Sequence, residues 1–302
     1  MYRSSTTTDS VSTKFGSFPL DGGESQNLGS VRHSRTMLKG EFGEGPVMFS
    51  GYLESDFLNP NPTQSHFRWR QYWGAARVGK WEILGGRAWS LLRPNRAGVH
   101  TDADTMNTRV VDPAYHVGLI GSRLRQVRLT RYIGDTTVAF AWEGPGNFVA
   151  KAAYDHAHQH VELAAFTGHY GRRGIQGSAV LSPTARVHLV TQEYWGENAV
   201  YQALGVVAPG ISGLATLQGA EVRVTKNTEV YGYGGLVYAD HVKATENRVV
   251  REATVGIDHR IRVSSNSSLL MSLQYSYLDR AIWSGRQGVM DYVQYRMRYT
   301  FN

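Results

Sequence analysis

The chain of 302 residues carries 32 Lys and Arg against 25 Asp and Glu, a net charge of +7 that attracts anions. It contains no Cys, which excludes disulfides and thiolate metal sites. Aromatic residues make up 11 %, and the 17 Tyr, 7 Trp and 33 Gly favour strands and turns over helices. No run approaches the ~18–20 consecutive apolar residues of a transmembrane helix, but a transmembrane strand needs only about ten residues with every second one apolar.

The N-terminal segment, residues 1–27, is polar and Gly-rich and lacks the basic-then-apolar layout of a signal peptide. From residue 28 to residue 302, segments that alternate apolar and polar residues predict strands joined as antiparallel hairpins in one β domain. In chain order, these segments are SRTMLKGEF with PVMFSGYLESDFL, FRWRQYWGAARVG with KWEILGGRAWSLL, VRLTRYIGD with TTVAFAWEG, NFVAKAAYDHA with HVELAAFTGHYG, GIQGSAVLSPTAR with VHLVTQEYWG, LQGAEVRVTKN with TEVYGYGGLVYAD, and the stretches 254–263, 268–277 and 293–301.

The connections between these segments alternate in length. Tight turns are expected near 79–80, 134–136, 226–228 and 264–267, and longer connections near 92–114, 197–214, 239–248 and 279–288. Outer-membrane barrels have this pattern, with short periplasmic turns and long extracellular loops. The predicted fold class is therefore all-β, an antiparallel transmembrane β-barrel of roughly 14–16 strands.

The predicted segments number about fifteen, whereas single-chain bacterial barrels have an even number of strands. We therefore expect the first strand to be truncated, so that Met1 falls inside or just after it. Residues 1–27 would then form an extracellular loop that follows the missing strand.

The last segment, VQYRMRYTFN, shows what the two faces of the predicted strands require. Successive side chains of a strand point to opposite faces, so Val293 and Met297 share one face while Arg296 and Arg298 share the other. A lipid-facing Arg at mid-bilayer costs about 2–4 kcal/mol, so the basic face must line a watery lumen. The residues that the same alternation places on the lumen side are Arg68, Arg70, Arg128, Arg223, Arg260, Arg262, Arg296, Arg298, Glu54 and Asp56.

The arginines make the predicted lumen basic, which concentrates and selects anions. One face of a soluble sheet would show the same alternation of solvated arginines, but the opposite face here is consistently Trp, Tyr, Val, Leu and Met. The acidic residues of the lumen phase either set up a transverse field across a pore or pair with the arginines. We favour the pairing.

The connection RPNRAGVHTDADTMNTRVVDP, residues 93–113, is long and polar. In pores, such a loop can fold inward and narrow the channel, where Arg93, Arg96 and Arg109 would dominate selectivity. An exposed surface loop is the alternative interpretation. Loops of this length are more often functional than idle.

Signals for metal binding and catalysis are weak. His156, His158 and His160 would share one face of a continuous strand, a spacing that suits zinc, but the hairpin pattern puts a tight turn at this place. The sequence contains no G-x-S-x-G, H-E-x-x-H or P-loop motif. We predict no catalytic residues, no metal site and no cofactor.

Several stretches of the chain resemble the DcaP-like porins, trimeric outer-membrane channels of Gram-negative bacteria: SRTMLKGEF, GYLESDFL, FRWRQYWG, WEILGGRAWSLL, RQVRLTRYIGD and AFAWEGPG. The resemblance implies a homotrimer in the bacterial outer membrane that is selective for small anionic organic solutes such as dicarboxylates. It also implies that Arg87, in GGRAWS, lies at the pore wall near the narrow zone and that Arg128 lies on the wall.

The sequence thus predicts a passive, anion-preferring porin whose partners are outer-membrane lipid and small anionic solutes, not nucleic acid. Two alternatives stay open. An outer-membrane barrel enzyme, such as a lipid hydrolase, requires a His at the rim within hydrogen-bond reach of a Ser. A soluble β-sheet binding protein requires solubility without detergent.

Overall fold

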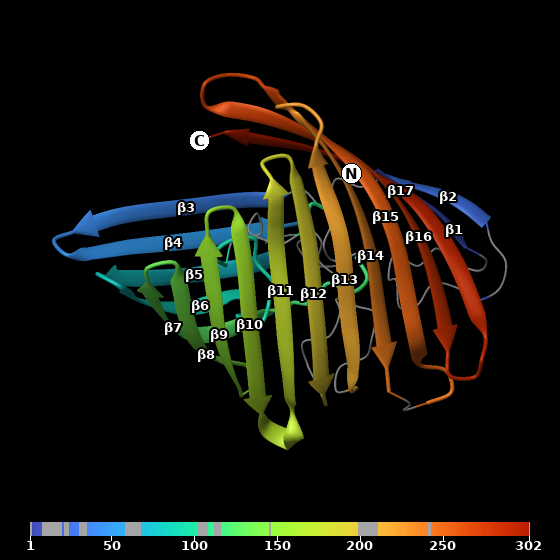
Figure 1. Cartoon of the computed structure of the whole chain (residues 1–302), viewed down its shortest axis with the longest axis horizontal. Helices are drawn as coiled ribbons and strands as arrows, with labels where there is room; N and C mark the ends of the chain where they lie inside the picture. Colours follow the sequence, from blue (N-terminus) through green and yellow to red (C-terminus); the bar gives the residue numbers. More distant parts are fainter. Residues whose placement is uncertain are drawn as a thin grey trace.

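The computed structural model describes residues 2–7, 20, 24–29, 35–57, 68–101, 108–111, 116–144, 146–198, 211–240 and 243–301, with the side chains of 2–7, 24–29 and 301 left aside. Most of these residues lie in strands (Figure 1). The strands are β1 Tyr2–Thr7, β2 Glu24–Gly29, β3 Arg35–Glu44, β4 Val47–Asp56, β5 Arg68–Val78, β6 Trp81–Trp89, β7 Arg123–Ile133, β8 Thr136–Glu143, β9 Asn147–His156, β10 Gln159–Gly168, β11 Arg173–Thr184, β12 Val187–Glu197, β13 Gly213–Arg223, β14 Thr228–Ala239, β15 Asn247–Arg262, β16 Ser267–Ile282 and β17 Gln287–Phe301. A short 3-10 helix, His169–Gly171, follows β10. No helix in the described part of the chain is long and apolar enough to cross a membrane.

The strands form one antiparallel sheet in chain order. Ladders join each strand to the next from β3 to β17. These are the strands that the alternation predicted, and short turns alternate with longer connections as far as β15. The longer connection expected near 279–288 is wrong, because β16 extends to Ile282 and only a short turn, 283–286, separates it from β17. Gly79 and Gly134 occupy two of the predicted tight turns with φ of 57° and 60°, a left-handed conformation that two-residue hairpin turns require.

Two short strands lie in the N-terminal segment, where the sequence analysis expected a loop. Strand β1 pairs antiparallel with β17, and β2 pairs antiparallel with β1. The prediction of a loop over residues 1–27 is therefore wrong at Tyr2–Thr7 and at residues 24–27 of β2. The physical reason is that β17 would otherwise present a row of unpaired backbone groups on this edge, and a Ser- and Thr-rich segment can pair through its backbone alone. A strand encoded ahead of Met1 stays a prediction.

The two faces of the sheet have the inverse of the distribution in a soluble protein. Apolar side chains such as Phe140, Leu163 and Met297 are 57 %, 56 % and 57 % exposed. In the opposite phase, the amide side chains of Gln176 and Gln294 are 0 % exposed. The predicted alternation, with the apolar side chains pointing out and the polar ones pointing in, is confirmed.

A β-bulge interrupts the alternation in β5. The β4–β5 ladder pairs Glu54 with Gln71 and Ser55 with Trp69, so Arg70 is the extra residue. A bulge re-aims side chains locally, and here Arg70 and Gln71 both reach the buried Glu54 on the inner face. Trp73 consequently points inward and stacks on Tyr52 with ring centroids 5.6 Å apart.

The sheet is strongly curved, so that β3 to β6 run nearly at right angles to β11 to β14 in the view of Figure 1. The connection between β6 and β7 runs on the inner side of this curve and packs against it. Its apolar residues Leu92, Val117 and Ile120 are 0 % exposed and belong to a cluster formed with inward-facing residues of β8 to β17. This connection and the wall around it make up the candidate site.

Candidate functional site

The connection between β6 and β7 folds into the interior. We call its described residues, 90–101, 108–111 and 116–122, the inner connection. Within it Arg93 is 0 % exposed and His116 is 1 % exposed. Of the two interpretations of residues 93–113, the inward fold is therefore confirmed for the described residues, while 102–107 and 112–115 lie outside them.

Carboxylates on the inner wall hold the first part of the inner connection by its backbone. The amide of Leu91 donates to Glu143 at 2.6 Å, and the amide of Asn95 donates to Glu162 at 3.2 Å. The amide of Gly98 donates to Asp155 at 3.0 Å. Each hydrogen bond to a charged acceptor is worth about 1.5–3 kcal/mol, so three successive strands, β8 to β10, fix this part of the chain.

Buried ion pairs and hydrogen bonds hold two of these carboxylates, Glu162 and Asp155, in position. Lys151 Nζ lies 2.8 Å from Glu162 and donates to the Arg93 carbonyl oxygen at 2.7 Å. His160 bridges Glu162 through Nε2 at 3.2 Å and Asp155 through Nδ1 at 2.8 Å. Buried charges persist only when they are paired and hydrogen-bonded, and Lys151 and Glu162 satisfy both conditions.

Arginines of the inner connection pair with acidic residues farther round the wall. Arg96 forms an ion pair with Glu221, which also accepts from Tyr233 Oη at 2.5 Å. Arg109 lies 3.4 Å from Glu229 and 3.7 Å from Glu221. Burial lowers the pKa of Arg109, but the carboxylates of Glu229 and Glu221 outweigh burial and raise it. The favoured pairing of wall carboxylates with arginines is confirmed at Glu221.

The last part of the inner connection contacts β15, β16 and β17. The amide of Val117 donates to Glu252 at 2.6 Å, and the amide of Val111 donates to Gln274 at 2.9 Å. Arg296 Nη1 donates to the Val111 carbonyl oxygen at 2.6 Å. The inner connection therefore attaches to the wall from β8 round to β17.

Glycines allow the backbone of the inner connection to lie directly against the wall. Gly118 has φ of 87°, and a Cβ at this position would meet the Thr216 carbonyl oxygen at 2.1 Å. A Cβ on Gly235 would meet the Val117 carbonyl oxygen at 1.9 Å. The glycine at 235 therefore serves close approach, here by the inner connection rather than by a neighbouring strand.

The wall on the other side carries a cluster of arginines. Arg68 donates to Asp56 at 2.9 Å and 2.7 Å, and Arg70 donates to Glu54 at 2.6 Å and to Asp56 at 2.5 Å. Arg35 lies 3.9 Å from Glu54. Sequence reasoning placed Arg68, Arg70, Glu54 and Asp56 on the inner face, and the structure brings them together, but it missed Arg35.

The other predicted lumen residues differ in their access to the interior. Arg128 is on the inner face but only 2 % exposed, because it donates to the Trp89 carbonyl oxygen and to Gln126. Arg296 contacts the inner connection, and Arg298 is half-buried in the same phase of β17. Arg223, Arg260 and Arg262 are exposed at the end of the sheet that carries the tight turns.

Arg87 does not lie where the resemblance implied. The ladders align it with Tyr72 and Arg125, in the same alternation phase as the exposed Ile83 and Val127. This is the outward phase, so the expected position of Arg87 on the pore wall is wrong. The inward positions of β6 on either side of it are small residues, Gly86 and Ala88, which the sequence analysis did not weigh.

The histidines that could have formed a zinc site are separated by a turn, and two of them pair with carboxylates instead. A turn at 157–158 separates His156 from His160, as predicted, and these two pair with Asp135 and Asp155 respectively. Among the described residues, no group of three His, Cys, Asp or Glu could hold a metal.

Ser182 Oγ lies 2.7 Å from His188 Nδ1 beside the turn between β11 and β12, which is the contact that the enzyme alternative requires.

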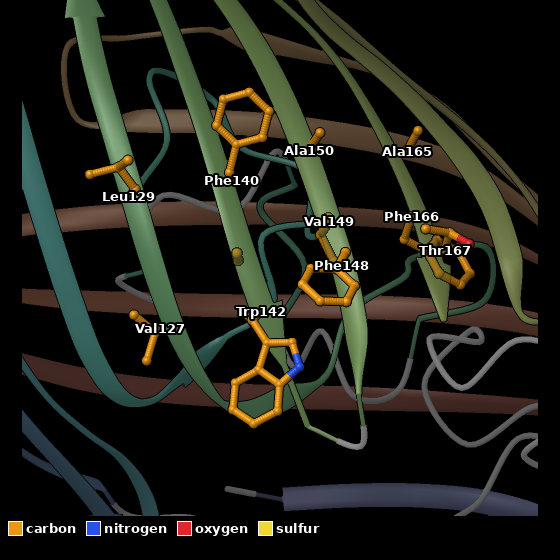
Figure 2. Close-up of a pocket in the computed structure, with 11 residues that line it drawn as sticks. Val127, Leu129, Phe140, Trp142, Phe148, Val149, Ala150, Ala165, Phe166 and Thr167 are labelled. Carbon is orange, nitrogen blue, oxygen red and sulfur yellow. The ribbon is translucent and has the colours of Figure 1, made fainter. Parts of the chain in front are cut away.

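The outer face carries an apolar groove of about 510 Å³ over β7 to β10. Figure 2 shows the bulky side chains of Phe140, Trp142 and Phe148 around the small residues Ala150 and Ala165. These residues belong to the outward phase of their strands. The groove is therefore part of the face that the sequence analysis expected to touch lipid.

Comparisons with known proteins identify the fold. No family model and no curated protein matches the chain. Among solved structures, the outer membrane channel DcaP of Acinetobacter baumannii matches with a TM-score of 0.79 and 14 % identity, over 99 % of this chain and 94 % of that chain. The chain has the fold of an outer-membrane porin barrel. OmpT, an outer membrane protein of Vibrio cholerae, matches with a TM-score of 0.62 and 8 % identity over 99 % and 96 % of the two chains. A mutant of the Rh. blastica porin matches with a TM-score of 0.51 and 12 % identity over 98 % of each chain.

The porin-type fold defines where the inner connection lies. In this fold the sheet is a wall that surrounds an interior, and the inner connection lies in that interior against β8 to β17. The fold that the resemblance to the DcaP-like porins implied is confirmed, since a DcaP channel is among the similar structures.

Proposed function

We propose that the protein is a passive porin of the bacterial outer membrane that prefers small anionic organic solutes such as dicarboxylates. One observation carries the proposal. Inside a porin-type fold, the carboxylates on one half of the wall are engaged in hydrogen bonds and an ion pair with the inner connection. Glu143, Glu162, Glu221 and Glu252 all contact it. The arginine cluster around Glu54 lies on the other half.

The proposed mechanism is diffusion without a chemical step. Guanidinium groups replace part of the hydration shell of a passing anion, and their field repels cations. The inner connection sets the width of the passage and covers acidic groups that would otherwise attract cations. Arg68, with 34 % of its side chain exposed, would meet the solute more directly than Arg70, which is 6 % exposed.

The placement in the membrane is part of the proposal. The outward apolar face would contact lipid, and the end with the longer connections would face the exterior, as in other outer-membrane barrels. We also propose a homotrimer, which the resemblance to the DcaP-like porins supports. One solved structure of OmpT of Vibrio cholerae is of its trimer form.

Planar-bilayer recordings test the proposed function. With a salt gradient across the bilayer, the reversal potential should have the sign of an anion-preferring channel. Replacing Arg68 and Arg70 together with Glu should shift it toward cations, and a wild-type channel that prefers cations would contradict the proposal. A protein that stays soluble without detergent and does not run as a heat-modifiable oligomer would instead favour the soluble binding protein.

A further inference from the structure

We propose that Arg35, Arg68, Arg70 and Arg123 form a binding site for a small dianion at the mouth of the lumen. The inference deepens the proposed function and rests on it, because the dianion would be a permeating solute. The chemical class is a compact molecule with two carboxylates.

Four strands bring the cluster together at one end of the sheet. Arg35, Arg68 and Arg123 are the first residues of β3, β5 and β7, while Asp56 is the last residue of β4. The ladders align Asp56 with both Arg35 and Arg68. Since neighbouring strands run antiparallel, all these residues lie at the end that carries the longer connections.

The two carboxylates of the cluster hold the arginines in place without neutralising them. Asp56 takes a bidentate contact from Arg68, and Glu54 takes one hydrogen bond from Arg70 and one from Gln71 at 2.6 Å each. Four guanidinium groups surround these two carboxylates, so the cluster retains an excess of positive charge. A bound dianion would balance that excess.

Arg123 carries a buried hydrogen-bond donor that the described residues around it leave without an acceptor. It stacks over the Trp89 ring at 4.5 Å and lies within electrostatic range of Arg70, Arg35 and Arg68. Its Nη1 is buried and, within the described part of the chain, has no hydrogen-bond acceptor. An unsatisfied buried donor costs free energy, and a carboxylate oxygen of the solute would supply the acceptor.

The sequence that flanks the cluster is basic rather than acidic. The connection from Asp56 to Arg68, FLNPNPTQSHF, contains no Asp or Glu. The segment that precedes Arg35, SVRHS, contains another arginine, Arg32.

The direction of the side chains identifies the source of the anion. Arg35 and Arg68 align with Asp56 in the inner phase, and Arg70 reaches Glu54 there, whereas the intervening residues Leu53 and Trp69 are 41 % and 48 % exposed on the outer face. Arg35 and Arg68 are partly exposed, at 27 % and 34 % of their side chains. A solute in the lumen reaches these two first, while a lipid headgroup on the outer face meets apolar side chains instead.

Calorimetric titration of malonate into the folded oligomer in detergent tests the site independently of conduction. Malonate should bind with saturation, and acetate, which has one carboxylate, should bind at least tenfold more weakly. Arg123→Gln should weaken malonate binding about tenfold, the effect of losing roughly 1.4 kcal/mol. Arg131→Gln is the matched control, because Arg131 lies in the same phase of β7 but at the opposite end of the strand, where it stacks over Trp81, and it should leave the affinity unchanged.

Heat-modifiable migration on a gel checks that each variant folds, and Arg35→Gln at the exposed edge of the cluster provides a second variant that should also weaken binding. Absence of saturable malonate binding to the wild type, or equal weakening by Arg123→Gln and Arg131→Gln, would overturn the site. Either result would leave the proposed function standing if bilayer recordings still show anion preference. A wild type that binds malonate but prefers cations would overturn the proposed function instead.

Discussion

The buried pair of Lys151 and Glu162 offers a quantitative test of how the inner connection is held. Glu162→Gln removes the negative charge that lies 2.8 Å from Lys151 Nζ. Both side chains are 0 % exposed, so water cannot compensate the remaining ammonium group. Breaking a buried pair by removing one partner costs about 3–5 kcal/mol of stability.

Removing both charges should cost less than removing one. The double variant Lys151→Met with Glu162→Gln loses the charge-assisted hydrogen bonds, worth about 1.5–3 kcal/mol, but leaves no uncompensated charge. We therefore expect the single Glu162→Gln variant to be less stable than the double variant by on the order of 1–2 kcal/mol. Asn95 retains an amide acceptor in both variants, so the difference reports the pair itself.

Urea unfolding of the refolded oligomer measures the free energies of all variants. Asp135→Asn is the control, because Asp135 is 56 % exposed at the turn between β7 and β8, where it pairs with the exposed His156; its effect should stay within about 0.5 kcal/mol. Single-channel traces of Glu162→Gln should show more open-channel noise than those of the double variant. A double variant that is as unstable as the single one would refute the coupling.

Three further predictions follow from the inner connection, the outer face and the Ser182–His188 contact. Gly235→Ala should lower single-channel conductance, because its Cβ would push the backbone at Val117 away from the wall and into the passage, whereas Gly234→Ala has no neighbour within 4 Å; equal conductances would argue against that contact. Ala150→Arg, in the outer groove, should cost about 2–4 kcal/mol of stability in lipid vesicles, and a neutral result would mean that this face does not meet lipid. Fluorophosphonate should not label Ser182, and labelling that disappears in His188→Ala would favour the barrel hydrolase.

The strands and their two faces were predictable because each depends on a local pattern. In β17, a period of two in side-chain character decides which residues face out, and Met297 and Gln294 lie as the pattern required. The tight turn at Gly79 was predictable for the same reason, since it depends on a residue type at one position. Antiparallel order followed from the short connections.

Other features depend on distant residues or on one inserted residue. The bulge at Arg70 shifts the phase of β5, and no residue type in FRWRQYWG marks it. The supports of the inner connection at Lys151 and Glu162 come from two other strands, and a single charged residue among alanines and valines was the only signal. Arg87 was misplaced because its position came from the resemblance, whereas its alternation phase is opposite to that of the inward-facing Leu84.

Single cysteines on adjacent residues test the central claim, that apolar side chains meet lipid and the basic side chains between them meet water. The chain has no native Cys, so each variant carries one thiol. Met297 and Arg298 lie in opposite phases of β17, and Leu38 and Lys39 do so in β3. In vesicles, a charged maleimide should label Arg298→Cys and Lys39→Cys quickly and leave Met297→Cys and Leu38→Cys unlabelled. Equal labelling within both pairs, or the reverse order, would contradict the account.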